Sequence, residues 1–196
     1  MNPRALVIGA SGQVGQHVAE ALRERGWDVT GTFASRPGAG LRRLDVLDDE
    51  AIASCVREVR PDVCVLSAAL TNVDGCEEEP ARAEAANARA PGVFADSCRA
   101  IGARVVLLST EYVFDGTAGP YSEGDAPSPI NVYGRTKLEG EARVLAADPR
   151  NLAVRTTVVF SHDPGGSNFV MQLLGRLSAG RTYRHGSRGS PSPRRS

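Results

Sequence analysis

The sequence has almost no lysine, no surplus of basic charge and no long apolar run. Its 196 residues include 23 basic and 23 acidic side chains, and Lys137 is the single lysine among the basic ones. Proteins that bind nucleic acid through its phosphates need a surplus of basic side chains, so this balance argues against that class. A membrane-spanning helix needs roughly 18 consecutive apolar residues, and no run approaches that length. We therefore expect neither nucleic acid nor a membrane as a partner.

The cysteines and the N-terminus lack the features of an exported protein. Cys55, Cys64, Cys76 and Cys98 show no paired close spacing, which favours buried, reduced thiols over a disulfide or zinc framework. The chain runs from Met1 almost directly into an apolar strand, without the long apolar core and cleavage site of a signal peptide. These features predict a cytoplasmic protein.

What the sequence does contain is an alternation of short apolar runs and stretches of helical periodicity. The runs predict strands over residues 5–8, 27–32, 41–46, 63–66, 104–108 and 152–160. The periodic stretches predict helices from the glycine-rich turn to Gly26 and over 51–59, 80–100, 131–147 and 168–177, with a bend or break at Pro91. Strands separated by helices predict an α/β fold, a Rossmann-type doubly wound parallel sheet with helices on both faces. Ligands of such sheets bind beyond the carboxyl ends of the strands.

The last sixteen residues differ in composition from the rest of the chain. Residues 181–196 hold five Arg, four Ser, two Pro and no acidic residue, so the first 180 residues carry a net charge of −5. We expect an NAD(P)-binding Rossmann domain over residues 1–180 and a basic, low-complexity, disordered tail over 181–196. A solvated tail is favoured there over a nucleic-acid-binding arm.

A glycine-rich turn lies between the first predicted strand and the first predicted helix. The segment Gly9-Ala10-Ser11-Gly12-Gln13-Val14-Gly15 spaces its glycines three apart. At this position glycines permit a tight turn, close approach of a pyrophosphate to the backbone and close packing of helix on strand. Free amides at the helix N-terminus then face the phosphates. A plain strand-to-helix turn is the alternative.

The end of the second predicted strand bears on the choice between NAD and NADP. An NAD enzyme of this fold usually has an Asp or Glu there, which holds the ribose hydroxyls. Here the strand ends Thr30-Gly31-Thr32-Phe33 without a carboxylate, and Arg36 follows. A guanidinium pairs well with a 2′-phosphate, so the sequence favours NADP over NAD. A solvated loop arginine is the alternative for Arg36.

Tyr133 and Lys137 have the most informative spacing in the chain. Residues four apart share one face of a helix, so the phenol and the ammonium converge on one site. A nearby cation lowers the pKa of a tyrosine and makes it a proton donor and acceptor near neutrality. Every other basic side chain counted in this chain is an Arg, and Arg suffices for surface ion pairs. This indicates that Lys137 is retained where a compact ammonium is needed. Ser109 or Thr110, directly after a strand, offers a hydroxyl for a substrate carbonyl.

Together these residues resemble the extended short-chain dehydrogenase/reductase superfamily, and within it the dTDP-4-dehydrorhamnose reductase family. The resemblance runs from Pro3 to about Phe169. The segments 112–116 and 131–134 are more specific to this branch than the glycine motif. The segments that carry it are Gly9–Gly15, Ser67–Asp74, Asn87-Ala88, Ser109–Gly116 and Pro127–Glu141.

The resemblance implies NADPH-dependent reduction of the 4-keto group of a dTDP-sugar, dTDP-4-dehydro-L-rhamnose to dTDP-L-rhamnose. Tyr133 would be the general acid, Lys137 would hold the nicotinamide ribose and lower the Tyr133 pKa, and Thr110 would hydrogen-bond the carbonyl. The implied cofactor-binding residues are Gly9, Gly12, Gln13, Val14 and Gly15 at the pyrophosphate, Asp45 and Val46 at the adenine, Ala68 and Ala69 at the ribose and nicotinamide, and Asn87 in support. The implied partner is a nucleotide-sugar substrate, and a homodimer is left open.

The sequence departs from the family at two places. Glu111 stands where the family usually has Asp. Family members also continue beyond the point where this chain stops, with a part that closes over the nucleotide-sugar. We therefore expect that the C-terminal substrate-binding part is largely missing and that residues 181–196 are a truncated or frame-shifted end.

Two other functions fit the same motifs. One is a non-catalytic NADP-binding regulator, similar to the β subunit of methionine adenosyltransferase. The other is a further nucleotide-sugar epimerase or reductase of the superfamily. Retention of Thr110, Tyr133 and Lys137 favours an enzyme, and the segment 112–116 favours the reductase.

Overall fold

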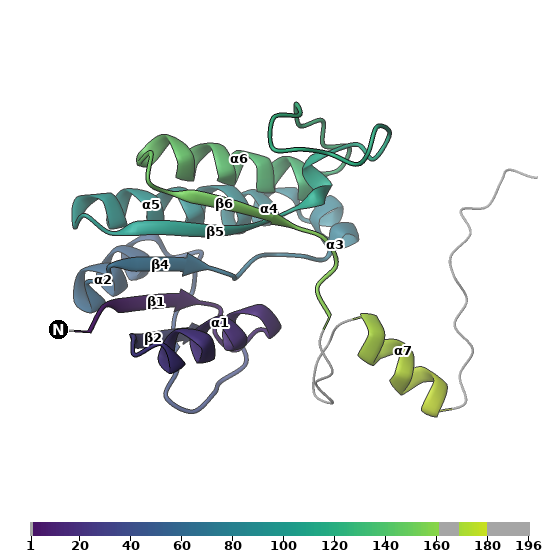
Figure 1. Ribbon diagram of the computed structural model, residues 1–196. Coiled ribbons are helices and arrows are strands. Elements are labelled where there is room, and N and C mark those ends of the chain that lie inside the picture. The colour runs from purple at the N-terminus through teal and green to yellow at the C-terminus, as the bar shows by residue number, and fades with distance from the viewer. Residues whose placement is uncertain (1, 161–168, 180–196) are drawn as a thin grey trace, which may run out of the picture. The chain divides into compact units, whose positions relative to one another are not determined.

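Six parallel strands form one sheet in the order β3-β2-β1-β4-β5-β6 (Figure 1). The computed structural model describes residues 2–160 and 169–179, which divide into two compact units between Val158 and Val159. The sheet lies wholly in the first unit, and the strand order reverses between β1 and β4, the switch point of a Rossmann-type fold. The predicted fold class is confirmed. The strands are β1 (Arg4–Ile8), β2 (Asp28–Phe33), β3 (Arg42–Arg43), β4 (Val63–Leu66), β5 (Arg104–Thr110) and β6 (Leu152–Thr156).

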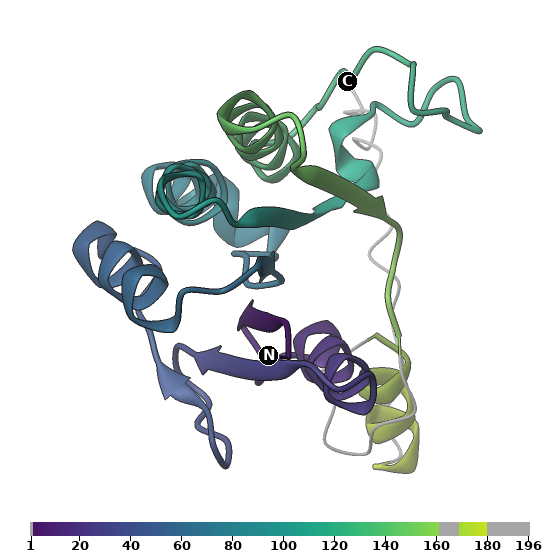
Figure 2. The same cartoon turned by 60° about the vertical axis from the view of Figure 1, so that its left-hand side comes forward.

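Helices cover both faces of this sheet, as Figure 2 shows for α1 on one side and α2, α5 and α6 on the other. In the first unit the helical segments are α1 (Gln13–Glu24), α2 (Asp49–Val59), α3 (Val73–Glu78), α4 (Pro80–Glu84), the π-helical turn η1 (Ala85–Arg89), α5 (Ala90–Ala100), the 3₁₀ turn η2 (Glu111–Val113) and α6 (Val132–Ala147). The second unit contains α7 (Phe169–Ser178), in which Val170 and Leu174 are exposed. No helix among the described residues is long and apolar enough to cross a bilayer.

Alternate residues of β1 point into two separate hydrophobic cores. Leu6 and Ile8 are buried in the larger core, together with side chains of α2, α5 and α6. Val7 is buried on the opposite face against Ala19 of α1. A strand buried on both faces reads as a continuous apolar run, which is the pattern of residues 5–8. All four cysteines are buried and unpaired.

The long helix predicted over residues 80–100 is interrupted one turn before Pro91. The structure has a π-helical turn at η1, and Pro91 lies in the first turn of α5. Proline has no N–H to donate to the carbonyl of Asn87, four residues earlier, so the α-helical hydrogen bond is absent there. The break therefore precedes the proline, where the helix widens to keep its other bonds.

Three further elements differ from the expected ones. β3 has only two residues because it pairs with no more than Thr32 and Phe33 at the edge of the sheet. β6 ends at Thr156, since its pairing with β5 ends where Thr110 ends that strand. The six-residue helix α3 was not predicted, although Asn72 caps it through Gly75 N–H. The tail expected over 181–196 lies outside the described residues.

Candidate active site

The predicted site residues gather at one edge of the sheet. The turn 9–15 follows β1, Arg36 follows β2, Asp45 and Val46 follow β3, and Ala68 and Ala69 follow β4; Thr110 ends β5. Because the strands are parallel, their carboxyl ends lie at the same edge. Tyr133 and Lys137 lie in the first half of α6, which packs against β5 and η2.

The turn between β1 and α1 leaves little room for a side chain at its glycine positions. Gly9 has φ +82°, and a Cβ on it would lie 2.9 Å from the Ala68 backbone nitrogen. A Cβ on Gly15 would lie 2.2 Å from the Gly9 carbonyl oxygen, and one on Gly12 would lie 3.2 Å from the same atom. The backbone of β1, α1 and the segment after β4 therefore approach one another more closely than any other residue type would permit.

The start of α1 has free hydrogen-bonding capacity. Gly12 is the N-cap residue and supplies no side-chain cap, so the amides of the first turn have no side-chain acceptor. The Gln13 Nε2 atom is buried without a hydrogen-bond partner among the described residues. Half-buried Val14 follows it on α1. A glycine cradle, uncapped amides and an unpaired amide donor fit the pyrophosphate of a dinucleotide.

The residues after β2 and β3 form the more open part of the edge. No carboxylate ends β2, and the Thr32 hydroxyl accepts from Gly9 N–H at 3.3 Å. Arg36 is exposed and makes no hydrogen bond or ion pair with any residue that the structure describes. Asp45 is exposed and accepts from Leu47 N–H at 2.9 Å, whereas Val46 is half-buried against the larger core. Arg36 is thus available to a phosphate from outside the fold.

The first turn of α6 places Tyr133 and Lys137. Asn131 caps the helix by accepting from Gly134 N–H at 2.7 Å. A Cβ on Gly134 would lie 2.1 Å from the Tyr112 carbonyl oxygen, so only glycine allows α6 to approach η2 this closely. Tyr133 and Lys137 are 8% and 2% exposed, and the Tyr133 ring meets the Tyr112 ring edge-on at 5.6 Å.

Burial sets the protonation of both residues. It lowers the pKa of Lys137 to about 8, against the negative charge of Glu141, which raises it. The Lys137 ammonium donates to the Leu108 carbonyl at 2.6 Å. Burial also raises the pKa of Tyr133, while a hydrogen bond with the Thr110 hydroxyl lowers it and the Glu111 charge raises it. The expected lowering of the Tyr133 pKa is therefore wrong for this arrangement, because desolvation outweighs the interactions that favour the phenolate.

Thr110 is buried at the end of β5 and contacts both neighbours that follow it. Its hydroxyl donates to the Glu111 carboxylate at 2.9 Å and accepts from Tyr112 N–H at 3.2 Å. The acid that departs from the family pattern thus bonds the hydroxyl expected to meet the substrate carbonyl.

Asn87 joins three segments around the site from the π-helical turn. Its side chain accepts from Leu70 N–H at 2.8 Å, donates to the Leu70 carbonyl at 3.0 Å and donates to the Thr136 hydroxyl at 3.3 Å. It thereby fastens the segment containing Ala68 and Ala69 to α6. On α6, Gly140 packs on the Asn87 backbone, where a Cβ would lie 2.2 Å from the carbonyl oxygen.

Comparison with known proteins shows the family to which this chain belongs. The family described as the RmlD substrate binding domain matches residues 3–185. The chain belongs to this family. The dTDP-4-dehydrorhamnose reductase of Streptomyces griseus is 44% identical to it over 179 residues, which are 90% of this chain and 56% of that protein.

Two further relatives extend the comparison of this RmlD-family chain. A crystal structure of dTDP-4-dehydrorhamnose reductase from Bacillus anthracis, in complex with NADP, matches with a TM-score of 0.81 and 32% identity, over 93% of this chain and 62% of that one. Methionine adenosyltransferase 2 subunit beta of Rattus norvegicus is 36% identical over 157 residues, 80% of this chain and 47% of that protein. The chain spans about half the length of the curated relatives that it matches.

A buried polar cluster of three residues adjoins the site in this RmlD-family chain, and of the three only Ser109 was a candidate from the sequence, for the substrate carbonyl. Glu141 is buried on α6 and accepts a hydrogen bond from Ser109 of β5. Arg155 of β6 binds the same carboxylate through Nε at 3.0 and 3.1 Å and through Nη2 at 2.6 Å. The available sequence signal was the position of Glu141, four residues after Lys137 on the same helical face. No group of three or more His, Cys, Asp or Glu within 2–160 and 169–179 could hold a metal ion.

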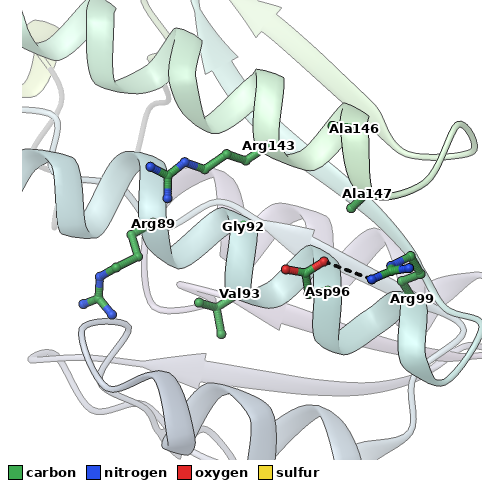
Figure 3. Close-up of a pocket in the computed structure, with 8 residues that line it drawn as sticks. All are labelled: Arg89, Gly92, Val93, Asp96, Arg99, Arg143, Ala146 and Ala147. Carbon is green, nitrogen blue, oxygen red and sulfur yellow. Dashed lines mark hydrogen bonds and ion pairs between the residues drawn. The ribbon is translucent and has the colours of Figure 1, made fainter.

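A separate hollow of about 450 Å³ lies between α5 and α6 (Figure 3). Its arginines are each bonded to a carboxylate: Arg89 to Asp49, Arg143 to Glu139 and Arg99 to Asp96. None of the predicted site residues lines it. The lining residues are Arg89, Gly92, Val93, Asp96, Arg99, Arg143, Ala146 and Ala147.

Proposed function

We propose that this chain carries the catalytic and cofactor-binding residues of an NADPH-dependent reductase of a dTDP-sugar, converting dTDP-4-dehydro-L-rhamnose to dTDP-L-rhamnose. The observation that carries the proposal is the convergence of Tyr133, Lys137 and the Thr110 hydroxyl around the carboxyl end of β5. The likeness to dTDP-4-dehydrorhamnose reductases supports the substrate class. A nucleotide-sugar partner and a cytoplasmic setting are part of the same proposal.

Tyr133 is the proton donor of the proposed reaction. Reduction of a ketone needs a proton for the carbonyl oxygen, and a phenol whose pKa is raised by burial retains its proton at neutral pH. NADPH, when bound, supplies the hydride to the carbonyl carbon. The Tyr133 O–H bond breaks as the proton moves to the former carbonyl oxygen, so the ketone becomes a secondary alcohol.

Thr110 and Lys137 assist that proton transfer. The Thr110 hydroxyl lies beside the phenol. When its one hydrogen turns from the Glu111 carboxylate to the substrate, it orients the carbonyl oxygen toward Tyr133 by hydrogen bonding. The Lys137 ammonium stabilises the phenolate that remains on Tyr133 and holds the ribose near the nicotinamide. Lysine suits this role because its charge is compact, and the buried position leaves little room for the fork of an arginine.

The cofactor is held by the carboxyl edge of the sheet. Gly9, Gly12, Gln13, Val14 and Gly15 contact the pyrophosphate, Asp45 and Val46 the adenine, and Ala68 and Ala69 the ribose and nicotinamide, while Asn87 supports this last segment. Arg36, which is exposed and unpaired among the described residues, binds the 2′-phosphate.

Cofactor fluorescence titration tests the binding half of the proposal. NADPH is expected to bind at least about tenfold more tightly than NADH, because a charge-assisted bond to a phosphate contributes about 1.5–3 kcal/mol. Arg36→Gln narrows that ratio. Arg25→Gln, which removes an exposed arginine at the far end of α1, is the matched control and leaves it unchanged. Equal affinity of the wild-type chain for both cofactors contradicts the assignment.

Oxidation of NADPH in the presence of dTDP-4-dehydro-L-rhamnose tests the catalytic half. Tyr133→Phe keeps the buried ring but removes the proton, and the expected loss of turnover is about 10²–10⁴-fold with unchanged NADPH affinity. Turnover equal to that of the wild-type chain would exclude Tyr133 as the acid.

The likeness to the methionine adenosyltransferase β subunit favours a second candidate, a regulator that binds NADP without catalysis. A regulator would bind NADPH through the same glycine turn but would not oxidise it with any 4-keto dTDP-sugar. It would also alter the activity of a methionine adenosyltransferase when mixed with it, and Tyr133→Phe would leave that effect intact. The reductase proposal expects NADPH to be oxidised with the 4-keto sugar and the activity of a methionine adenosyltransferase to stay unchanged.

A further inference from the structure

Glu141 is a buried carboxylate with no part in the reaction proposed above. It lies one helical turn after Lys137 and two turns after Tyr133, so the three side chains share one face of α6. Its side chain is 3% exposed. A buried carboxylate is costly unless it is fully hydrogen-bonded, so its partners indicate what it holds in place.

The partners of Glu141 come from the two strands beneath α6. Ser109 of β5 donates its hydroxyl to Oε1, and Arg155 of β6 binds both carboxylate oxygens at 2.6–3.1 Å. A bidentate guanidinium restricts the orientation of the carboxylate more than a single bond does. The Arg155 guanidinium also lies over the Phe114 ring, with Cζ 5.1 Å from its centroid. Glu141 therefore fastens α6 to β5, to β6 and, through Arg155, to the segment that follows η2.

Three polar contacts join α6 to the end of β5. Three consecutive residues of β5 each meet one of the three residues on the helix face. The Leu108 carbonyl accepts from Lys137, Ser109 donates to Glu141, and the Thr110 hydroxyl is hydrogen-bonded with Tyr133. A slip of the helix by one residue would break all three contacts together.

We propose that Glu141 is a positioning residue, whose carboxylate sets the register of α6 on β5 and β6 and keeps Lys137 in its charged form beside Tyr133. This inference deepens the proposed reductase function and rests on it for its catalytic meaning. The effect on Lys137 itself is independent of turnover. The charged groups that face the Glu141 carboxylate are Arg155 from β6 and Lys137 from its own helix, and β5 contributes the neutral Ser109.

The single lysine of the chain makes the test direct. Protein grown with lysine labelled with ¹³C at Cε, and carrying no lysine in any tag, gives one side-chain signal, which belongs to Lys137. The signal is followed by NMR as a function of pH without substrate or cofactor. The wild-type midpoint is expected at about 8. Glu141→Gln removes the charge that favours the ammonium, and the midpoint should fall by about one pH unit.

Glu139→Gln is the matched control for this titration. It makes the same substitution two residues earlier on α6, at an exposed carboxylate that pairs with Arg143. Its Lys137 midpoint should equal that of the wild type. Glu141→Asp keeps the charge and should return the midpoint most of the way to the wild-type value.

Loss of Glu141 leaves Arg155 without its carboxylate partner, which destabilises the fold. A second variant therefore removes both side chains of the pair. Glu141→Gln combined with Arg155→Gln leaves no guanidinium without its carboxylate, and circular dichroism verifies that it folds. Its Lys137 midpoint should also lie below that of the wild type. A midpoint at or above the wild-type value in either folded Glu141 variant overturns the proposal.

The same variants separate this inference from the proposed function. If the chain reduces the sugar, the alkaline limb of kcat shifts to lower pH in Glu141→Gln by the amount that the Lys137 midpoint shifts, and Glu139→Gln leaves it in place. If the chain does not reduce the sugar, the NMR shift persists. A role limited to holding α6 on the strands would lower stability and would lower neither the Lys137 midpoint nor the pH of the alkaline limb.

Discussion

The two ends of the proposed site differ in the groups that form them, backbone atoms at one end and side chains at the other. At the turn between β1 and α1, backbone atoms face one another where glycines leave space, and Gly9, Gly12 and Gly15 contribute no side chain. At the contact of α6 with β5, buried polar side chains do the positioning, and Lys137 and Glu141 carry charge into the interior. The glycine turn thus depends on missing side chains, and the contact of α6 with β5 depends on buried polar side chains.

This difference has an energetic consequence. Gly9 and Gly15 have no room for an added Cβ, because the nearest obstacles are backbone atoms that cannot rotate away. The helix–strand contact instead holds a desolvated cation, which disfavours folding unless its bonds compensate. Substitution should therefore destabilise the turn and, at one position, stabilise the contact.

The largest expected effect comes from an added methyl group in the turn. Gly15→Ala would place a Cβ 2.2 Å from the Gly9 carbonyl oxygen and 2.7 Å from the Ser67 hydroxyl. We expect a loss of about 3 kcal/mol or more in the free energy of unfolding, measured by urea denaturation. Gly124→Ala, where nothing lies within 4 Å, is the control and should be neutral or slightly stabilising. Wild-type stability of Gly15→Ala would show that the turn yields.

The next effect has the opposite sign and concerns Lys137. Lys137→Met should raise the free energy of unfolding by about 2–3 kcal/mol at pH 7. Folding lowers the Lys137 pKa from 10.5 to about 8, so the ammonium is less stable in the folded state than in the unfolded chain. Between pH 8 and 10.5 the unfolded chain binds more protons than the folded one, so the wild type gains stability as pH rises. The advantage of the variant should shrink over that interval.

Exposed Arg135 on the same helix provides the control for that experiment. Arg135→Met should change the free energy of unfolding by no more than about 0.5 kcal/mol at every pH. A Lys137→Met variant that is less stable than the wild type at pH 7 would mean that the bond to Leu108 outweighs desolvation.

An intermediate effect is expected where the two ends are joined. Asn87→Ala removes the bonds to Leu70 N–H, the Leu70 carbonyl and the Thr136 hydroxyl. We expect a loss of about 2 kcal/mol in thermal or urea unfolding, since partly buried backbone groups are left unpaired. Asn72→Ala, which removes a single exposed cap of α3, should cost about 1 kcal/mol or less. Equal losses in the two variants would remove the special role of Asn87.

The smallest effect is expected at the far end of α6, where the buried Asp148 carboxylate pairs with the exposed Arg150 side chain. Hydrogen bonds from Arg150 lower the pKa of Asp148 to about 2. A lowered carboxyl pKa stabilises the fold above the ordinary value of 3.8, and this contribution disappears as pH falls toward 2. Asp148→Asn should thus be slightly less stable at pH 7 and equal to the wild type near pH 2 in urea titrations. Asp96→Asn, at an exposed carboxylate of α5, is the control.

The features that could be predicted from the sequence are those that depend on residues close together in the chain. The apolar run 5–8, the glycine spacing and the four-residue separation of Tyr133 and Lys137 each describe one element, and the fold class follows from their alternation. The bonds of Glu141 to residues 109 and 155 join different elements, and no periodicity encodes them. The direction of the Tyr133 pKa was missed for the same reason, since burial depends on what packs around the ring.

The contact between Gly140 and the π-helical turn links two positions across the family. Pro91 leaves the Asn87 carbonyl without its α-helical donor, and Gly140 is the residue on α6 that meets this carbonyl. A relative with a larger residue at position 140 would therefore need a different backbone path near 87, and a relative without the proline would have a regular helix there. We expect these two positions to vary together, so that grafting α6 from one relative into another succeeds only when the turn is exchanged with it.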